Sequence, residues 1–231
     1  HIVFDLDVIY HTPLPAGSKL LCANHPTTLD PVMMTTLVHE QVSILITETL
    51  FKVPGLGKSL AAAGHIPVFS SNGRQALEEG IRTLQAGRTV GIFPEGEISQ
   101  AEGGLAHIHT GAARLAIATG VPLIPIGIAL DKDKIFRVKT IVDGKVEVGT
   151  WYLNGGYAIT VGKPMLFQDD PSNKYVSEVT DQIAGQILEL SKESARRLAD
   201  RRPQKPIIYP ALKRSWALFS NLPVKALSAR K

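Results

Sequence analysis

The stretch LLCANHPTTLD, residues 20–30, joins an apolar run to a turn that carries a histidine and a carboxylate. The apolar run predicts a buried strand, and Pro26 sets the direction in which the chain leaves it. Five residues are enough for a turn into a helix that begins near Pro31, and the first turn of that helix carries Asp30 back toward the His25 ring. We therefore predict a strand, turn and helix that bring His25 and Asp30 together.

Apolar runs alternate with helical patterns on both sides of this stretch, which predicts an α/β fold with a mostly parallel central sheet flanked by helices. Gly87 and Gly120 stand where helices are expected to stop. In the segment 139–162, Asp143-Gly144 and Asn154-Gly155-Gly156 separate alternating runs, which predicts a mixed, hairpin-rich edge. The predicted strands are Ile2–Val8, Lys19–Cys22, Val42–Ile46, His65–Phe69, Thr89–Phe93 and Leu123–Ile128, and the predicted helices are Pro31–Val38, Gly55–Ala63, Arg74–Gln85, Gly111–Thr119 and Tyr175–Leu198.

The composition is that of a globular chain: 231 residues, 44% hydrophobic and 20% charged, enough for one sizeable core over residues 1–200. The single cysteine, Cys22, excludes an internal disulfide framework and favours a cytoplasmic setting. The longest uncharged stretch, residues 115–130, is too short and too broken by proline and glycine to span a bilayer. The sequence begins at His1 without a methionine, and whether an anchor precedes it is left open.

The last 31 residues, 201–231, differ in charge from the rest of the chain. They hold eight basic residues and no acidic one, whereas 17 basic and 21 acidic residues precede them. Trp216 and Phe219 lie among these charges together with aliphatic residues, a mixture suited to an anionic lipid surface. Two interpretations stay open: a membrane-binding tail, or an extension that packs its apolar residues on the body.

Residues that follow the strands are candidates for a binding site, because open α/β sheets bind ligands beyond the carboxyl ends of their strands. His25 and Asp30 follow one strand. FPEGE, residues 93–97, follows another and presents Glu95 next to Gly96, a residue that allows close backbone approach to a ligand. Two strand ends therefore offer an imidazole and two carboxylates to one edge of the sheet.

In three blocks the sequence resembles the glycerolipid acyltransferases, a family typified by 1-acyl-glycerol-3-phosphate acyltransferase. His25 and Asp30 match the H-x4-D motif, FPEG at 93–96 matches a second block, and VPLIPIGI at 121–128 matches a V-P-x-x-P block. The blocks follow the family's order, and the resemblance covers about residues 18–165. It implies an O-acyltransferase of phospholipid biosynthesis that moves a fatty acyl group from an acyl thioester to the hydroxyl of a lysophospholipid.

The residues themselves suit this chemistry. An acceptor hydroxyl must lose its proton as it attacks a thioester, and a neutral imidazole is a suitable base at neutral pH. Asp30 would accept a bond from Nδ1 of His25, leave Nε2 free and stabilise the imidazolium, so no enzyme serine is needed. The alternative is that Asp30 caps the helix and His25 is only a turn residue.

The resemblance further implies that Glu95 and Gly96 position the glycerol part of the acceptor, whereas Glu95 could also be a carboxylate at a helix N-terminus. Many family members carry an arginine that contacts the acceptor phosphate, and this sequence has Ser70 at that place. Arg74, the nearest arginine, either takes the place of that family arginine or is an exposed residue in the first turn of a helix. A phosphate-bearing acceptor is therefore less firmly predicted than the reaction itself.

Other patterns are weaker. KVPGLGKS at 52–59 lacks the first glycine of a phosphate loop, and the histidines at 107 and 109 have no recognised zinc-ligand spacing. We expect no metal and no resident cofactor, with acyl-CoA or acyl carrier protein as the donor substrate. The expected partners are a lysophospholipid and an anionic membrane surface, and no nucleic acid is expected. We expect the protein to be peripheral, on the cytoplasmic side of a membrane. A hydrolase with the same base and a silent lipid-binding module are the alternative functions.

Overall fold

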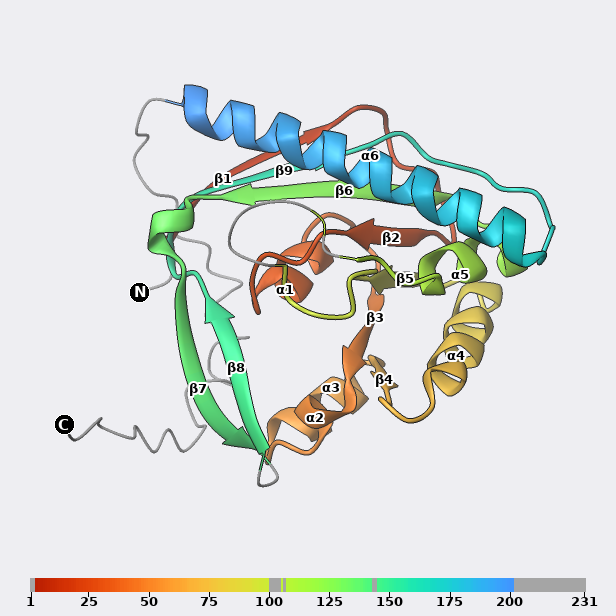
Figure 1. Cartoon of the computed structure of the whole chain (residues 1–231), viewed down its shortest axis with the longest axis horizontal. Coiled ribbons are helices and arrows are strands. Elements are labelled where there is room, and N and C mark those ends of the chain that lie inside the picture. The colour runs from red at the N-terminus through yellow and green to blue at the C-terminus, as the bar shows by residue number, and fades with distance from the viewer. Residues whose placement is uncertain (1–2, 100–104, 106, 143–144, 202–231) are drawn as a thin grey trace.

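The computed structural model describes residues 3–99, 105, 107–142 and 145–201. Its centre is a seven-stranded sheet with the strand order β1-β9-β6-β2-β5-β3-β4 (Figure 1). Neighbouring strands run parallel except β6 and β9, which are antiparallel. The seven strands are β1 (Val3–Tyr10), β2 (Leu20–Ala23), β3 (Val42–Thr47), β4 (Ile66–Val68), β5 (Thr89–Ile92), β6 (Leu123–Leu130) and β9 (Asn154–Val161). The predicted α/β fold class is confirmed.

Strand β2 lies in the middle of the sheet and is buried on both faces. Leu21 and Ala23 belong to the hydrophobic core that includes helix α1 (Asp30–Thr35). Leu20 and Cys22 point to the opposite core, under helices α5 (Gly111–Thr119) and α6 (Asn173–Asp200). This two-sided burial explains the unbroken apolar run in the sequence. Burial also raises the pKa of the Cys22 thiol far above its usual range, as expected for a core residue.

Helix α6 runs along β6 and β9 and covers that face of the sheet (Figure 1). It begins after Ser172, whose hydroxyl accepts a hydrogen bond from the main-chain N–H of Tyr175. Its buried side chains recur at helical spacing and include Val176, Val179, Ile183, Ile187 and Leu190. The helix extends two residues further at each end than predicted.

The remaining helices are α2 (Glu48–Phe51), which was not predicted from the sequence, α3 (Leu56–Ala62), the longer α4 (Gly73–Gln85) and the 3-10 turn η1 (Lys132–Lys134). Helix α1 ends at Thr35, before the predicted Val38, because the N–H groups of Thr36 and Leu37 bond three residues back, to Met33 and Met34. Gly120 ends α5 in the left-handed conformation, as predicted.

One predicted hairpin is present and the other is wrong. Strands β7 (Phe136–Val142) and β8 (Lys145–Trp151) pair in a separate antiparallel sheet, and the intervening residues 143–144 lie outside the described part. The residues Asn154-Gly155-Gly156 form no turn but begin β9, which returns to the main sheet between β1 and β6. Gly156 serves close packing instead, because a Cβ there would lie 2.3 Å from Leu198 of α6.

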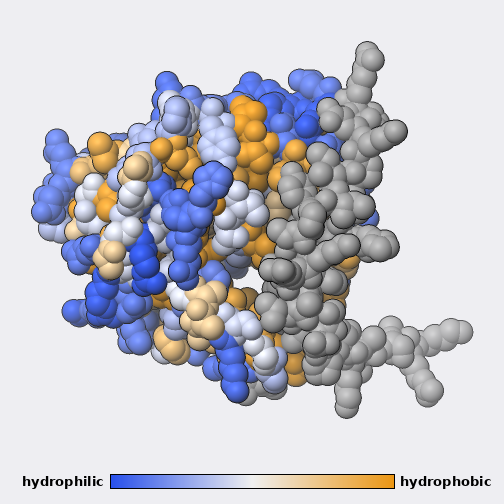
Figure 2. All heavy atoms as spheres, turned by 180° about the vertical axis from the view of Figure 1, so that it is seen from behind, coloured by the Kyte–Doolittle hydropathy of each residue, from blue (hydrophilic) through white to orange (hydrophobic). Residues whose placement is uncertain are grey.

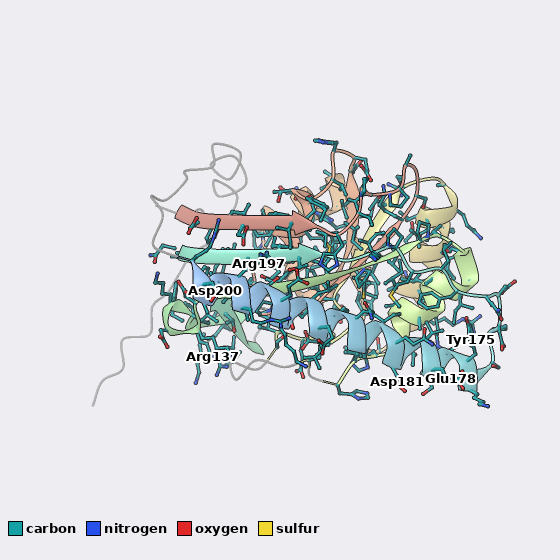
Figure 3. All side chains as sticks on the ribbon, turned by 90° about the horizontal axis from the view of Figure 1, so that it is seen from above. Arg137, Tyr175, Glu178, Asp181, Arg197 and Asp200 are labelled. Atoms are coloured by element: carbon teal, nitrogen blue, oxygen red, sulfur yellow. The ribbon has the colours of Figure 1, made fainter. Side chains whose placement is uncertain are left out.

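The C-terminal end of α6 is tied to the first strand by ion pairs. Arg197 reaches from α6 toward β1 and β9 (Figure 3), where its Nε lies 2.8 Å from Asp7 and one Nη donates to the carbonyl of Ile159 at 2.9 Å. Arg201 pairs with Asp5 at 3.3 Å. These bonds attach β1, the edge strand, to the helix that covers the sheet.

Seen from behind, the described surface shows hydrophobic residues among hydrophilic ones (Figure 2). Within the described residues, none of the helices has the length and apolar character needed to cross a membrane. The predicted basic tail falls outside the described residues except for Arg201.

Gly127 of β6 is expected to be essential for the contact between sheet and helix. A Cβ at this position would lie 2.1 Å from main-chain atoms of Leu190 and Ser191, which cannot rotate away. Gly127→Ala should lower the free energy of unfolding by about 3 kcal/mol in urea denaturation. Gly185→Ala is the control, since a Cβ there meets nothing within 4 Å, and it should raise stability by up to about 1 kcal/mol. Equal effects of the two variants would contradict this account of the packing.

Candidate active site

The exit of the chain from β2 is held in place by Asn24. Its side-chain N–H donates to the carbonyl of Ile128 at 2.9 Å, and its side-chain oxygen accepts from the Ile128 N–H at 2.7 Å. The buried amide thus continues the pairing of β2 with β6 for one residue beyond the end of the strand. His25 follows directly, so its position at the carboxyl edge of the sheet is set by main-chain geometry.

His25 and Asp30 meet as predicted. The imidazole Nδ1 lies 2.9 Å from Asp30 Oδ2, and the carboxylate is fully buried. A carboxylate only accepts hydrogen bonds, so Nδ1 carries the proton and Nε2 of the neutral ring is left with a lone pair. Asp30 is the first residue of α1, its N-cap is Leu29, and no side chain caps the helix. The alternative of a capping Asp30 is therefore wrong.

Three further hydrogen bonds hold the Asp30 carboxylate. The N–H of Thr27 donates to Oδ2 at 2.6 Å, the hydroxyl of Thr27 donates to Oδ1 at 2.8 Å, and the hydroxyl of Tyr157 donates to Oδ1. Burial alone disfavours a charged carboxylate, and four donors offset that cost. Burial and the neighbouring Asp30 charge raise the pKa of Tyr157 well above its usual value, so the phenol keeps the proton that it donates.

The His25 ring is also supported on its face. Phe93, which follows β5, stacks on the imidazole with ring centroids 4.2 Å apart and an angle of 24° between the planes. The His25 side chain keeps a small exposed fraction, 16%, whereas Asp30 behind it has none. No described residue hydrogen-bonds Nε2, so this nitrogen is the part of the pair available to a ligand.

The loop that follows β5 is bonded to the main chain of His25. Glu95 is almost completely buried, and its Oε1 accepts from the His25 N–H at 2.9 Å and from the Ser99 hydroxyl at 2.6 Å. The N–H of Ser99 in turn donates to the His25 carbonyl at 2.8 Å. The next described helix, α5, begins only at Gly111, so Glu95 is not at a helix N-terminus. The structure thus brings Glu95 to the pair.

Gly96 lies beside Glu95 in a conformation that favours glycine, with φ at 69°. A Cβ at this position would also lie 3.0 Å from the His109 ring. Both the backbone and the nearby imidazole therefore require a glycine at this position. The close approach of His109 is a contact that the sequence analysis did not foresee.

Arg74 is not brought to the pair. It lies in the first turn of α4 with 85% of its side chain exposed, and its Nε donates to Glu78 at 2.8 Å. Among the described residues, no contact joins it to His25, Asp30 or Glu95. This placement matches the alternative in which Arg74 is an exposed first-turn residue.

Sequence reasoning missed Asn24, Thr27 and Tyr157. The first two flank His25 in the opening stretch, where a polar residue at the end of a buried strand could have signalled a role in the turn. Tyr157 is 127 positions away from Asp30, and nothing in the sequence pattern connects the two. The described part of the chain contains no group of three histidine, cysteine, aspartate or glutamate side chains able to hold a metal ion.

The fold and the site together define an α/β protein with a buried histidine–aspartate pair at the carboxyl edge of its sheet. The family model named Acyltransferase matches residues 6–129, more than half of the chain. The chain therefore belongs to the acyltransferase family, and the resemblance stated from its motifs is confirmed. The match includes His25, Asp30, Glu95 and Gly96.

Several curated 1-acyl-sn-glycerol-3-phosphate acyltransferases are similar to this chain. The enzyme from Escherichia coli is 29% identical over 140 residues, which are 58% of this chain and 57% of that protein. The enzyme from Salmonella typhimurium is 26% identical over 208 residues, which cover 85% of this chain and 79% of that protein. The chain thus spans little more than half of the first relative and about four fifths of the second.

A solved structure has the same fold. The 1-acyl-sn-glycerophosphate acyltransferase from Thermotoga maritima superposes with a TM-score of 0.59 at 19% identity, over 86% of this chain and 74% of that one. At this identity the likeness concerns the fold alone.

Tyr157 should matter for turnover, because among the described residues it is the donor to Asp30 that comes from a distant strand. Tyr157→Phe removes only the hydroxyl and should lower kcat about tenfold in an acyl-transfer assay while leaving KM unchanged, since it loosens the carboxylate that orients the His25 ring. Tyr152→Phe is the matched control: that hydroxyl donates to the carbonyl of Gly156 instead, in the same aromatic cluster. Initial rates of both variants decide the matter, and a similar loss in both would mean that only general packing is affected.

Proposed function

We propose that this chain transfers a fatty acyl group from an acyl thioester to the free hydroxyl of a lysophospholipid, with His25 as the general base. The observation that carries the proposal is the hydrogen bond between His25 Nδ1 and the buried Asp30 carboxylate at the edge where ligands of such sheets bind. Family membership and the activity named for its relatives support the same reaction.

The proposed reaction proceeds in two steps. Nε2 of His25 takes the proton of the acceptor hydroxyl while that oxygen attacks the thioester carbon. The carbon–sulfur bond then breaks, and the imidazolium returns the proton to the departing thiolate, so that an ester and a free thiol are formed. Asp30 stabilises the imidazolium between the two steps and holds the ring in the tautomer that keeps Nε2 free.

The enzyme side chains near His25 favour a substrate nucleophile. The hydroxyl of Ser99 donates to Glu95 and lies 3.3 Å from the main-chain N–H of His25. The imidazole therefore does not activate Ser99. Cys22 is fully buried, and its raised pKa keeps it a thiol. The acceptor hydroxyl is accordingly the group whose proton His25 removes.

The acceptor we propose is a 1-acylglycerol-3-phosphate, the substrate class in the relatives' names. Glu95 and Gly96 would position its glycerol part, with Glu95 acting partly through the main chain of His25. Arg74 would contact the phosphate, which requires it to leave its exposed ion pair with Glu78, a pair of the kind that contributes little stability. The proposed donors are acyl-CoA or acyl carrier protein, without a resident cofactor.

We further propose a peripheral position on the cytoplasmic side of an anionic membrane. The basic tail supports it by its charge of +8, although Arg201, the first of these residues, is already paired with Asp5. Each of the seven other basic residues of the tail would contribute about 1 kcal/mol near an anionic surface.

Loss of the base should nearly abolish the reaction. His25→Ala is expected to lower turnover at least about a hundredfold, and Asp30→Asn less, because it disturbs the tautomer without removing the imidazole. The exposed His39 supplies the control variant His39→Ala, which should keep the wild-type rate. Thiol release is measured with and without lysophosphatidate: release without acceptor would indicate a hydrolase, and wild-type rates in a folded His25→Ala protein would exclude His25 as the base.

Arg74 is tested by the charge of the acceptor. Arg74→Ala should raise the KM for a phosphate-bearing lysolipid about tenfold and leave a neutral monoacylglycerol unaffected, because a hydrogen bond to phosphate is lost. Arg82→Ala is a matched control, since Arg82 lies on the same helix, α4, and also pairs with a glutamate, Glu79. If both acceptors respond alike to Arg74→Ala, Arg74 does not bind the phosphate.

A further inference from the structure

The β7–β8 hairpin carries one face on which basic and aliphatic residues are combined. Residues directly opposite each other in an antiparallel pair share a face, and so do residues two apart. The register pairs Ile141 with Val146, Lys139 with Val148 and Arg137 with Thr150, so these six residues line one face, which has no acidic member. We call it the basic–aliphatic face.

The apolar residues of this face are unusually exposed. Ile141 is 65% exposed and Val146 64%, and Val148 follows with about half of its surface open. Nearer the base of the hairpin, Thr150 is buried. Arg137 lies at the outside of the molecule (Figure 3), and Lys139 is exposed as well.

The order of residues along the hairpin resembles a depth profile through a lipid surface. On this face the outermost pair, Ile141 and Val146, is purely aliphatic, the next pair combines Lys139 with Val148, and Arg137 lies closest to the base; the pair nearest the tip, Val142 and Lys145, belongs to the opposite face. Aliphatic side chains are stable among acyl chains, whereas Lys and Arg prefer the level of anionic headgroups. An acidic protein partner would complement the two cations but gives no reason for an aliphatic pair at the far end.

The hairpin also stands at the edge of the sheet where the chemistry is placed. It follows the carboxyl end of β6, which runs parallel to β2 and therefore ends at the same edge as the strand before His25 (Figure 1). Two hydrogen bonds join it to the His25–Asp30 turn: the Thr28 N–H donates to the Thr150 carbonyl at 2.8 Å, and the Thr150 N–H donates to the Thr28 hydroxyl at 3.0 Å.

We propose that the basic–aliphatic face of the β7–β8 hairpin inserts into the headgroup region of an anionic lipid bilayer and presents the His25 edge to it. The inference rests on the proposed lipid acceptor, which is the reason for a membrane at this edge. It assigns a membrane contact to the body of the protein, separate from the basic tail. Insertion of Ile141 and Val146 supplies the apolar contribution, and Arg137 and Lys139 supply the charge.

An environment-sensitive fluorophore on a single introduced cysteine tests this directly in the full chain. Val146→Cys carries the probe, and Cys22 does not react under native conditions because it is fully buried. Leu166→Cys is the control, since Leu166 is 72% exposed and follows Met165, which pairs with Leu123 at the opposite edge of the sheet. With vesicles of phosphatidylcholine and phosphatidylglycerol, emission at position 146 should rise at least about twofold and that at 166 should stay unchanged. No response at 146, or equal responses at both, would overturn the proposal, as would a response to acyl carrier protein alone.

Substitutions on the face provide the second measurement. Ile141→Ser together with Val146→Ser should weaken partition of the full chain onto these vesicles at least about tenfold, whereas Leu166→Ser should leave it within about twofold. Arg137→Gln with Lys139→Gln should reduce the preference for anionic over pure phosphatidylcholine vesicles. The basic tail is present in every variant, so its contribution cancels. No acyl donor is needed, and a protein that inserts but transfers no acyl group would refute the proposed reaction alone.

Discussion

The carboxylate of Asp30 is the group on which the rest of the site depends. It is fully buried and charged, so it must be surrounded by donors, and these come from the turn after β2 and from strand β9. Because Tyr157 has to reach it, the side chain of Tyr157 on β9 must lie on the same face of the sheet as α1. A requirement of one side chain thereby constrains where two distant parts of the chain meet.

The scaffold that satisfies this requirement is closely packed. Alternate residues of β2 enter opposite cores, and α6 approaches β6 and β9 so closely that Gly127 and Gly156 have no room for a side chain. A frame packed in this way tolerates little displacement. The loops that carry His25 and Glu95 are bonded to each other and to this frame, so the imidazole is held in place before any substrate arrives.

The edge of the sheet that carries His25 and Asp30 also carries an exposed apolar surface. The hairpin after β6 is joined to the His25–Asp30 turn through Thr28 and Thr150, while its far end presents aliphatic side chains to solvent. The proposed lipid acceptor has its reactive hydroxyl near the headgroup and its acyl chain in the bilayer. An enzyme for such a substrate has to bring its base to the headgroup level, and a projecting element beside the base is a physical means of doing so.

Local sequence was enough to predict the α/β class, the strand–turn–helix unit with His25 and Asp30, the long helix near the C-terminal end of the sheet domain and the family. These features depend on local periodicity, on short spacing and on motifs, all of which are contained in neighbouring residues. The prediction of a hairpin turn at Asn154-Gly155-Gly156 was wrong because glycines occur both in turns and at close contacts. Only the position of Leu198 beside Gly156 distinguishes the two. Only the folded chain shows that Tyr157 donates to Asp30 and that Glu95 accepts from the His25 N–H, whereas Arg74 keeps a local, exposed ion pair with Glu78. The first two contacts depend on which residues of distant segments become neighbours when the core closes, because a buried charge is stabilised by donors in space regardless of their position in the chain.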